Sequence, residues 1–210
     1  DDGFTWRDRH NIADPNFWLW RVTWHKDRAY GVAYRCNPAS EEDKFARLYV
    51  SRNGTDFEPL VERLFDTGHP TESAIVFDGD TAYCLLRRDG NPNTGQIGTS
   101  QPPYTAWEWQ DLGARTGGPD MVLLPDGRFL AGVRLYDGQE RTALCWIDPR
   151  SGAFTEALTL PSGGDNSYPG LVLQGETLWI SYYSSHEGKT SIYLAKADMS
   201  PSGSHNDNRT

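Results

Sequence analysis

The amino-acid sequence predicts an all-β protein, a β-propeller with about four blades, from three observations. Two apolar stretches joined by a short polar turn recur four times along the chain, and the copies lie about 50 residues apart. An aromatic residue at the start of an outgoing strand recurs at nearly the same interval. Repeats of this length are typical of propeller blades, which are four-stranded sheets. A β-sandwich also has short strands and turns, but it does not predict this recurrence.

The four hairpins open at polar residues spaced 51, 48 and 48 residues apart: Arg21, Glu72, Asp120 and Tyr168. Short polar turns between alternating apolar residues, Asp-Gly above all, are among the strongest hairpin signals in a sequence. We therefore expect eight of the strands to pair around the turns Lys26-Asp27, Asp78-Gly79, Asp126-Gly127 and Gln174-Gly175.

The aromatic repeat supports the same four units and indicates where the ring is incomplete. Its members are spaced 51, 50 and 47 residues apart, at Trp6, Phe57, Trp107 and Phe154. Since the first unit begins in mid-blade, and since propellers close with four to eight blades, we expect N-terminal blades to be missing. We predict the propeller over residues 1–198 and a disordered tail over 199–210, where Ser, Asn and Gly dominate.

Composition excludes several classes of function. The net charge of −9, with no basic tract, disfavours binding to nucleic acid or anionic membranes. No apolar run is long enough to span a bilayer. The three cysteines stand singly in apolar runs, which favours buried free thiols, and the histidines lack metal-ligand spacing, so we expect neither a metal nor a cofactor. Localisation is left open; a secreted or periplasmic protein whose leader is absent is one interpretation.

The repeat register predicts that four polar side chains meet at one mouth of the ring. Arg21, Glu72, Asp120 and Tyr168 each lie six residues before a turn residue, so they occupy equivalent positions in successive blades. A polar residue that enters the innermost strand tends to face the central axis. Glu72 and Tyr168 are two blades apart and are expected to approach each other across the ring.

A second set of polar residues closes the next strand of each hairpin. Arg87, Arg134 and Tyr183 follow the turns by eight or nine residues, and Arg88 competes with Arg87 for this position. Two neighbouring guanidinium groups suit a carboxylate ligand. Alternatively, Asp120 or Glu72 could neutralise them in salt bridges.

Several segments resemble the sialidase (neuraminidase) superfamily. "DDGFTW" matches the later part of the Asp-box turn of sialidase propellers, and "SRNGTDF" at 51–57 resembles a degenerate copy. "TESAIVFDGDTAYCLLRRDG", "GPDMVLLPDGRFLAGVRLYDG" and "SYPGLVLQGETLWISYYSS" are similar to sialidase segments in which a Glu or Tyr opens a hairpin and an Arg closes it. The resemblance is to bacterial BNR-repeat proteins of the exo-sialidase type and covers residues 1 to about 197.

The resemblance implies a sialidase-type propeller and a glycoside hydrolase that removes terminal sialic acid or a related acidic sugar with retention. It implies Tyr168 as the nucleophile and Glu72 as its base partner. A neutral phenol avoids the repulsion that a carboxylate nucleophile meets at an anomeric carbon bearing a carboxylate. The expected partner is a sialylated or acidic glycan, and the expected substrate-binding residues are Arg87, Arg134, Arg88, Arg21, Asp120 and Tyr183.

Two departures keep other functions open. The general-acid Asp and the third arginine of sialidases have no secure counterpart, so the chain could be an inactive part of an enzyme. A non-catalytic carbohydrate-binding propeller and a protein-interaction scaffold are the alternatives, because a fold does not determine a function. The enzyme hypothesis predicts that the Glu72 carboxylate lies within hydrogen-bond distance of the Tyr168 hydroxyl, with Arg134 in the same cavity.

Overall fold

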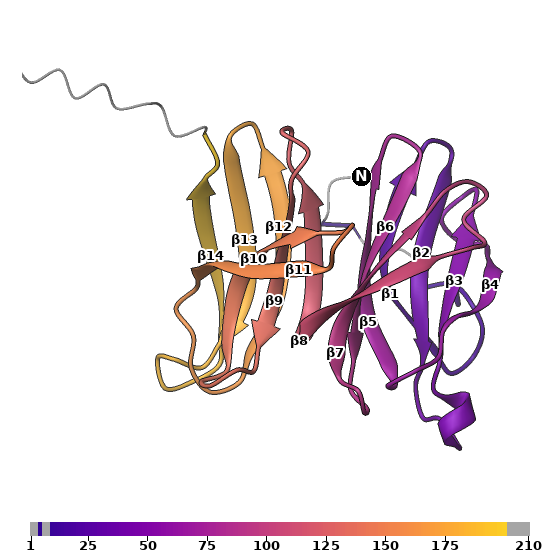
Figure 1. Ribbon diagram of the computed structural model, residues 1–210, viewed down its shortest axis with the longest axis horizontal. Coiled ribbons are helices and arrows are strands. Elements are labelled where there is room, and N and C mark those ends of the chain that lie inside the picture. The colour runs from indigo at the N-terminus through magenta and orange to yellow at the C-terminus, as the bar shows by residue number, and fades with distance from the viewer. Residues whose placement is uncertain (1–3, 6–8, 201–210) are drawn as a thin grey trace, which may run out of the picture.

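The computed structural model describes residues 4–5 and 9–200, and these form an all-β molecule with one short 3-10 helix (Figure 1). Trp6 and residues 201–210 lie outside the described residues, so the first aromatic repeat and most of the expected tail are not covered. The strands are β1 (Phe17–His25), β2 (Arg28–Arg35), β3 (Ala46–Ser51), β4 (Phe57–Phe65), β5 (Pro70–Asp78), β6 (Thr81–Arg88), β7 (Thr94–Ser100), β8 (Glu108–Leu123), β9 (Phe129–Leu135), β10 (Arg141–Asp148), β11 (Ala153–Thr159), β12 (Asn166–Gln174), β13 (Thr177–Ser184) and β14 (Ser191–Asp198), with the helix η1 (Glu41–Asp43) between β2 and β3.

All neighbouring strands pair antiparallel, in sheets of four, seven and three strands. The seven-stranded sheet is two blades that share β8. The first part of β8 pairs with β7, from Glu108 to Arg115, and its second part pairs with β9, from Thr116 to Leu123. The described residues therefore make four blades, which begin at β1, β5, the second part of β8, and β12.

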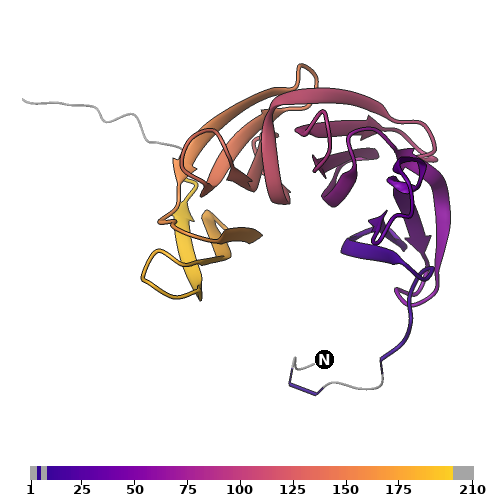
Figure 2. The same ribbon diagram turned by 90° about the horizontal axis from the view of Figure 1, so that it is seen from below.

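The first strands of the four blades lie around a common axis. β1 contacts β5, β5 contacts β8 and β8 contacts β12, although these strands belong to different hairpins. Figure 2 shows the sheets arranged radially along an open arc, with the β1 and β12 blades at its two ends. This is the arrangement of a β-propeller, as the repeat predicts.

The four predicted hairpins are all present, but their turns differ in detail. β5 and β6 pair up to Asp78 and Thr81, so the turn is Gly79–Asp80, one residue later than expected. The turn after β12 is likewise Gly175–Glu176. Gly79 and Gly175 both have a positive φ, which a two-residue hairpin turn requires at its first central position. The third hairpin instead has a five-residue connection, 124–128.

Three apolar clusters join the blades in pairs. Leu48 and Leu86 lie in the cluster between the first two blades, and Leu85 and Val133 in the next. The last cluster includes Leu144 and Ile180, from the third and fourth blades. Each of these side chains is at most 3% exposed. Because apolar burial is the main driving force of folding, the stacking of successive sheets holds the arc together.

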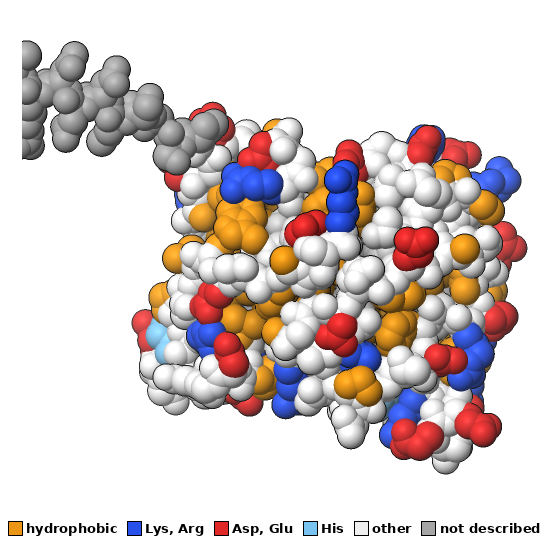
Figure 3. Space-filling view, in the orientation of Figure 1, with side chains coloured by type: hydrophobic (Ala, Val, Ile, Leu, Met, Phe, Trp, Pro, Cys, Tyr) orange, Lys and Arg blue, Asp and Glu red, His pale blue; other side chains and the backbone are white. Residues whose placement is uncertain are grey.

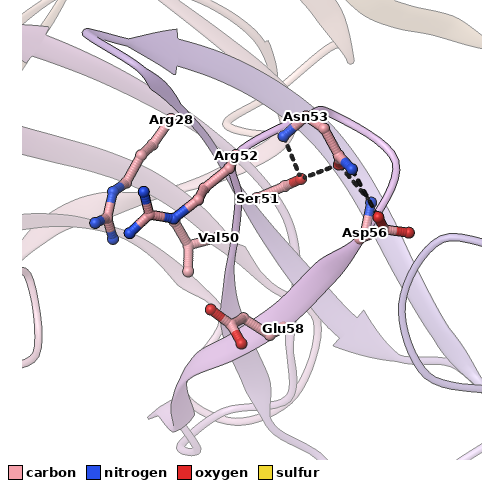
Figure 4. A pocket seen from close by; sticks show the side chains of 7 residues that line it. All are labelled: Arg28, Val50, Ser51, Arg52, Asn53, Asp56 and Glu58. Atoms are coloured by element: carbon pink, nitrogen blue, oxygen red, sulfur yellow. Dashed lines mark hydrogen bonds between the residues drawn. The ribbon is translucent and has the colours of Figure 1, made fainter.

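The turn at 51–57 is closed by its own side chains. Ser51 Oγ accepts hydrogen bonds from the N–H groups of Asn53 and Gly54, and Asn53 Oδ1 accepts from those of Thr55 and Asp56. The turn borders a hollow of about 310 Å³ (Figure 4). Ser51 pairs with Ala29, at the turn end of β2, so this hollow lies at the opposite end of the sheet from Arg35.

The described surface carries charges of both signs. In the view of Figure 3, basic side chains lie singly among acidic, polar and apolar ones. Within residues 4–5 and 9–200, no helix is long and apolar enough to cross a membrane.

Candidate active site at the mouth of the propeller

Each innermost strand has a bulge at the same level of the propeller. The ladders shift between Leu19 and Arg21 in β1, and between Pro70 and Ser73 in β5. They shift again between residues 117 and 120 in β8 and between 167 and 170 in β12. A bulge re-aims side chains and is frequent beside functional sites. Residues in the bulges, including Glu72 and Tyr168, therefore point differently from the paired residues that follow.

Glu72 and Tyr168 meet across the axis, as the register predicts. The Tyr168 hydroxyl donates a 2.8 Å hydrogen bond to Glu72 Oε1, although the residues are 96 positions apart in sequence. Glu72 is 5% exposed, whereas Tyr168 is 37% exposed. The carboxylate is thus buried beneath a phenol whose ring remains accessible.

Arg87, at the end of β6, holds the other oxygen of Glu72. Its Nη1 donates to Glu72 Oε2 at 2.9 Å, and its Nε and Nη2 reach Asp89 Oδ1 at 2.9 and 2.8 Å. The Thr71 hydroxyl lies 3.1 Å from Glu72 and 3.3 Å from Asp89. Both oxygens of Glu72 are therefore engaged, which fixes its orientation toward Tyr168.

A second network lies beside Tyr168. Arg134, near the end of β9, donates from Nη2 to Asp165 Oδ1 at 2.9 Å and to the Tyr183 hydroxyl at 2.8 Å, and from Nε to the carbonyl of Asn166. The Tyr183 hydroxyl also donates to Asp165 at 2.9 Å. The Tyr183 ring stacks on Tyr168, with centroids 5.9 Å apart. This contact joins the two networks.

Aromatic rings continue from Tyr168 toward the first blade. Trp20 lies 5.2 Å from Tyr168 between centroids, and Trp18 lies 6.5 Å from Trp20 and 5.8 Å from Tyr34. Trp18 is 58% exposed, so its ring is open to solvent. Aromatic faces of this kind bind the apolar faces of sugar rings.

The phenols of the site are held in their neutral form. Burial, followed by the charge of Glu72, raises the pKa of Tyr168 and that of Tyr34. Burial and the hydrogen bond to Asp165 raise the pKa of Tyr183 to about 12. Tyr168 could therefore act as a nucleophile only if a base removed its proton, and Glu72 is the group within reach.

The register predicts that all four polar side chains meet at one mouth of the ring, but the hydrogen bonds and ion pairs of Arg21 and Asp120 do not go to the side chains of Glu72 and Tyr168. Arg21 and Asp120 form a separate ion pair, with Arg21 Nη1 3.3 Å from Asp120 Oδ2. The reason is the bulges: Arg21 and Asp120 are the first paired residues after them, whereas Glu72 and Tyr168 lie within them. The repeat register could not reveal which residues lie in a bulge and which are paired in the ladder.

Arg88 does not line the mouth. Its guanidinium bonds to Thr94 and Asp111 on the second blade, and its side chain is 4% exposed. Neighbouring strand residues point to opposite faces, so only Arg87 reaches Glu72. Of the two alternatives for the arginines, the structure shows salt bridges: Arg87 pairs with Glu72, one of the two acids considered, and Arg134 pairs with Asp165.

Two residues of the site escaped the sequence reasoning. Asp89 and Asp165 follow or precede strands, where Asp is ordinarily a turn residue. The available signal was their nearness in sequence to Arg87 and Tyr168. Among the described residues, no group of three or more His, Cys, Asp and Glu side chains is placed to hold a metal ion.

The fold is similar to that of several solved structures. A protein of unknown function from Dyadobacter fermentans matches with a TM-score of 0.70 and 17% identity, over 84% of this chain and 52% of that one. The Bacteroides ovatus protein Xyloglucan PUL GH43B matches with a TM-score of 0.64 and 19% identity, over 89% and 39%. An endo-arabinase from Bacteroides thetaiotaomicron matches with a TM-score of 0.62 and 17% identity, over 89% and 79%.

These similarities correct the sialidase resemblance. No family model matches the sequence, and neither does any curated protein. The similar solved structures named above are a GH43 protein, an endo-arabinase and a protein of unknown function, and none of the three is named as a sialidase, so the assignment to the sialidase superfamily is wrong. The Asp-box and hairpin motifs suggested the wrong family because they reflect the blade repeat, which other propellers share. The chain spans about half the length of the first of these structures and about two fifths of the second.

Proposed function

We propose that the mouth of this propeller is the sugar-binding site of a glycoside hydrolase, with Tyr168 and Glu72 at its reacting centre. The observation that carries this proposal is the hydrogen bond between the accessible phenol of Tyr168 and the buried carboxylate of Glu72. Two further observations support it. The adjoining rings of Trp18, Trp20 and Tyr183 offer stacking surfaces, and the similar solved structures include glycosidases.

In the proposed reaction, Tyr168 attacks the anomeric carbon while Glu72 takes the phenolic proton. The bond from the phenolic oxygen to the anomeric carbon forms as the glycosidic bond breaks, and the leaving oxygen keeps the bonding electron pair and takes a proton from solvent. Water then attacks the anomeric carbon and loses a proton to solvent, which releases the sugar with retention, while the Tyr168 oxygen recovers its proton from Glu72. Arg87 keeps the second oxygen of Glu72 engaged, so the first oxygen faces the phenol.

A phenol nucleophile suits a sugar with a carboxylate on its anomeric carbon, because a neutral group meets no like-charge repulsion there. Arg134 is the candidate partner for such a carboxylate. Its side chain is 15% exposed, whereas that of its partner Asp165 is 67% exposed. A ligand carboxylate can displace an exposed acid more easily than a buried one, because less desolvation opposes the exchange.

The test compares aryl glycosides of an anomeric-carboxylate sugar with those of galactose and arabinose. An aryl leaving group needs no general acid. Tyr168→Phe and Glu72→Gln are each expected to lower turnover by about 100-fold or more. The controls are Tyr193→Phe and Glu187→Gln, which alter a similar phenol–carboxylate hydrogen bond between β14 and the loop that precedes it. Unchanged turnover in Tyr168→Phe would refute the nucleophile assignment.

Binding of a neutral glycan without hydrolysis is the second candidate. Arg87 already bridges two carboxylates, and the acids of the mouth neutralise its arginines, which favours an uncharged ligand. In this case, titration calorimetry would detect saturable binding of galactose or arabinose oligosaccharides by wild type and by Glu72→Gln alike. Trp20→Ala would weaken the binding, and no substrate would turn over.

A further inference from the structure

We infer that Arg21 and Asp120 act as a pair to position Tyr168 against Glu72 at the proposed active site, on which this inference rests. They are positioning residues, since their hydrogen bonds to β12 go to the backbone of Pro169 and Leu171 and not to the Tyr168 side chain. They act through the backbone that follows Tyr168.

Arg21 holds the last residue of the β12 bulge, and Asp120 holds the strand just after it. Arg21 Nη2 donates a 2.7 Å hydrogen bond to the carbonyl of Pro169. Asp120 Oδ2 accepts a 2.8 Å hydrogen bond from the N–H of Leu171, and its Oδ1 accepts from the N–H of Met121. Arg21 and Asp120 are also paired with each other, at 3.3 Å. The first and third blades thus hold the fourth at the residues next to Tyr168.

Tyr168 needs such a support because its backbone is unusual. Its φ is +47°, in the left-handed region that non-glycine residues seldom occupy. Conformations of this kind persist only when the surrounding structure imposes them. Arg21 and Asp120 provide constraints on the C-terminal side of the bulge.

The bulge of β12 also lies tightly against two glycines, Gly118 of β8 and Gly132 of β9. A Cβ placed on Gly118 would come within 2.6 Å of Tyr168 Cδ1, and one on Gly132 within 2.8 Å of Pro169 Cγ. The bulge therefore has little space to move toward these glycines. A shift of the Pro169 carbonyl would carry the Tyr168 hydroxyl away from Glu72.

The simpler alternative is that Arg21 and Asp120 only stabilise the fold. The Asp120 carboxylate is largely buried, and burial raises its pKa while Arg21 opposes this shift. A purely structural pair would affect unfolding without altering the surroundings of the Tyr168 phenol. A measurement made on that phenol in the folded protein distinguishes the two roles.

The experiment follows Tyr168 by NMR in the full chain labelled with ¹³C at the ζ carbon of tyrosine, without any sugar. Tyr168→Phe identifies the Tyr168 resonance. In Arg21→Met, the midpoint of its alkaline titration should move about one pH unit toward the ordinary tyrosine value near 10, because the phenol leaves Glu72 and becomes more hydrated. Arg21→Lys should give a smaller shift, since an ammonium lacks the planar fork that reaches both acceptors.

The matched control is Arg141→Met, which removes a guanidinium that bonds Glu156 and Asp137 on the third blade. It should leave the Tyr168 midpoint unchanged. An unchanged midpoint in folded Arg21→Met, or an equal shift in the control, would overturn the inference. If Arg21→Met does not fold, the midpoint of the Tyr168 titration is measured in Arg21→Lys and Asp120→Asn instead, and an unchanged midpoint in both would overturn the inference. Failure of the proposed function would be seen separately, as unchanged turnover in Tyr168→Phe.

Discussion

Tyr183 links the two halves of the proposed site, and its ionisation should be coupled to stability. Its pKa is raised to about 12, against an ordinary value near 10, by burial and by the hydrogen bond to Asp165. A raised pKa in the folded state favours the protonated phenol. Its contribution to stability is therefore complete below pH 10 and is lost as the pH rises toward 12.

We therefore predict that the free energy of unfolding, measured by urea denaturation, falls between pH 10 and pH 12. In Tyr183→Phe this fall should be smaller, because phenylalanine does not titrate. Below pH 9, the free energies of unfolding of the variant and of the wild type should change with pH in the same way. An equally steep fall in both proteins would show that other groups account for the whole alkaline loss.

At this scale, the repeat register predicted that Glu72 and Tyr168 approach each other, because each opens a hairpin two repeats from the other, but it predicted the same for Arg21 and Asp120. The sialidase resemblance singled out Glu72 and Tyr168, and the structure shows their hydrogen bond although that resemblance is wrong. Sequence reasoning could not choose between Arg87 and Arg88, since one residue of register reverses the face to which a side chain points. It placed Arg21 and Asp120 with the pair because it could not detect the bulges. A bulge adds a residue without leaving a mark in the apolar pattern.

The stability of the turn at 51–57 depends on two side chains, Ser51 and Asn53. Asn53 Oδ1 accepts two backbone N–H groups, and its Nδ2 donates to Asp56 at 2.6 Å. We predict that Asn53→Ala lowers the free energy of unfolding by about 1–2 kcal/mol, since it leaves those N–H groups without their acceptor. Thermal and urea denaturation would measure the loss.

Glu58→Ala is the matched control for Asn53→Ala. Glu58 borders the same hollow and is exposed, so its removal should change stability by no more than about 0.5 kcal/mol. An equal effect of the two substitutions would mean that the turn is not held by Asn53.

The hairpins were predictable because Asp-Gly and Gln-Gly are turn signals between apolar runs. The continuity of β8, by contrast, could not be predicted from the sequence. Its middle contains Gly113, Gly117, Gly118 and Pro119, residues that ordinarily interrupt a strand. It continues because its two parts pair with different partners, and this depends on the positions of neighbouring blades.

For the whole molecule, the ends of the arc expose apolar side chains. β14 is an edge strand, and Ile192 and Leu194 on it are 85% and 64% exposed. Unpaired edges with exposed apolar residues favour association between molecules. We predict that Ile192→Lys combined with Leu194→Lys reduces self-association of the chain in light scattering, with little change in melting temperature.

Leu158→Lys serves as the comparison, because Leu158 is 46% exposed on another edge strand, β11. Leu158→Lys should reduce self-association less than the double variant on β14 does, since Leu158 lies away from the open end of the arc. The opposite ranking would mean that β14 is not the principal surface of contact.

The shared strand β8 also has a consequence for how this protein can be rearranged. Cutting the chain between β4 and β5 interrupts no strand, so new termini there would leave the ladders of all four blades intact. New termini inside β8 would detach the outer edge of one blade from the inner edge of the next. Circular permutants and split versions of the molecule should therefore have their new termini at residues 66–69, and the second and third blades should be transplanted only together.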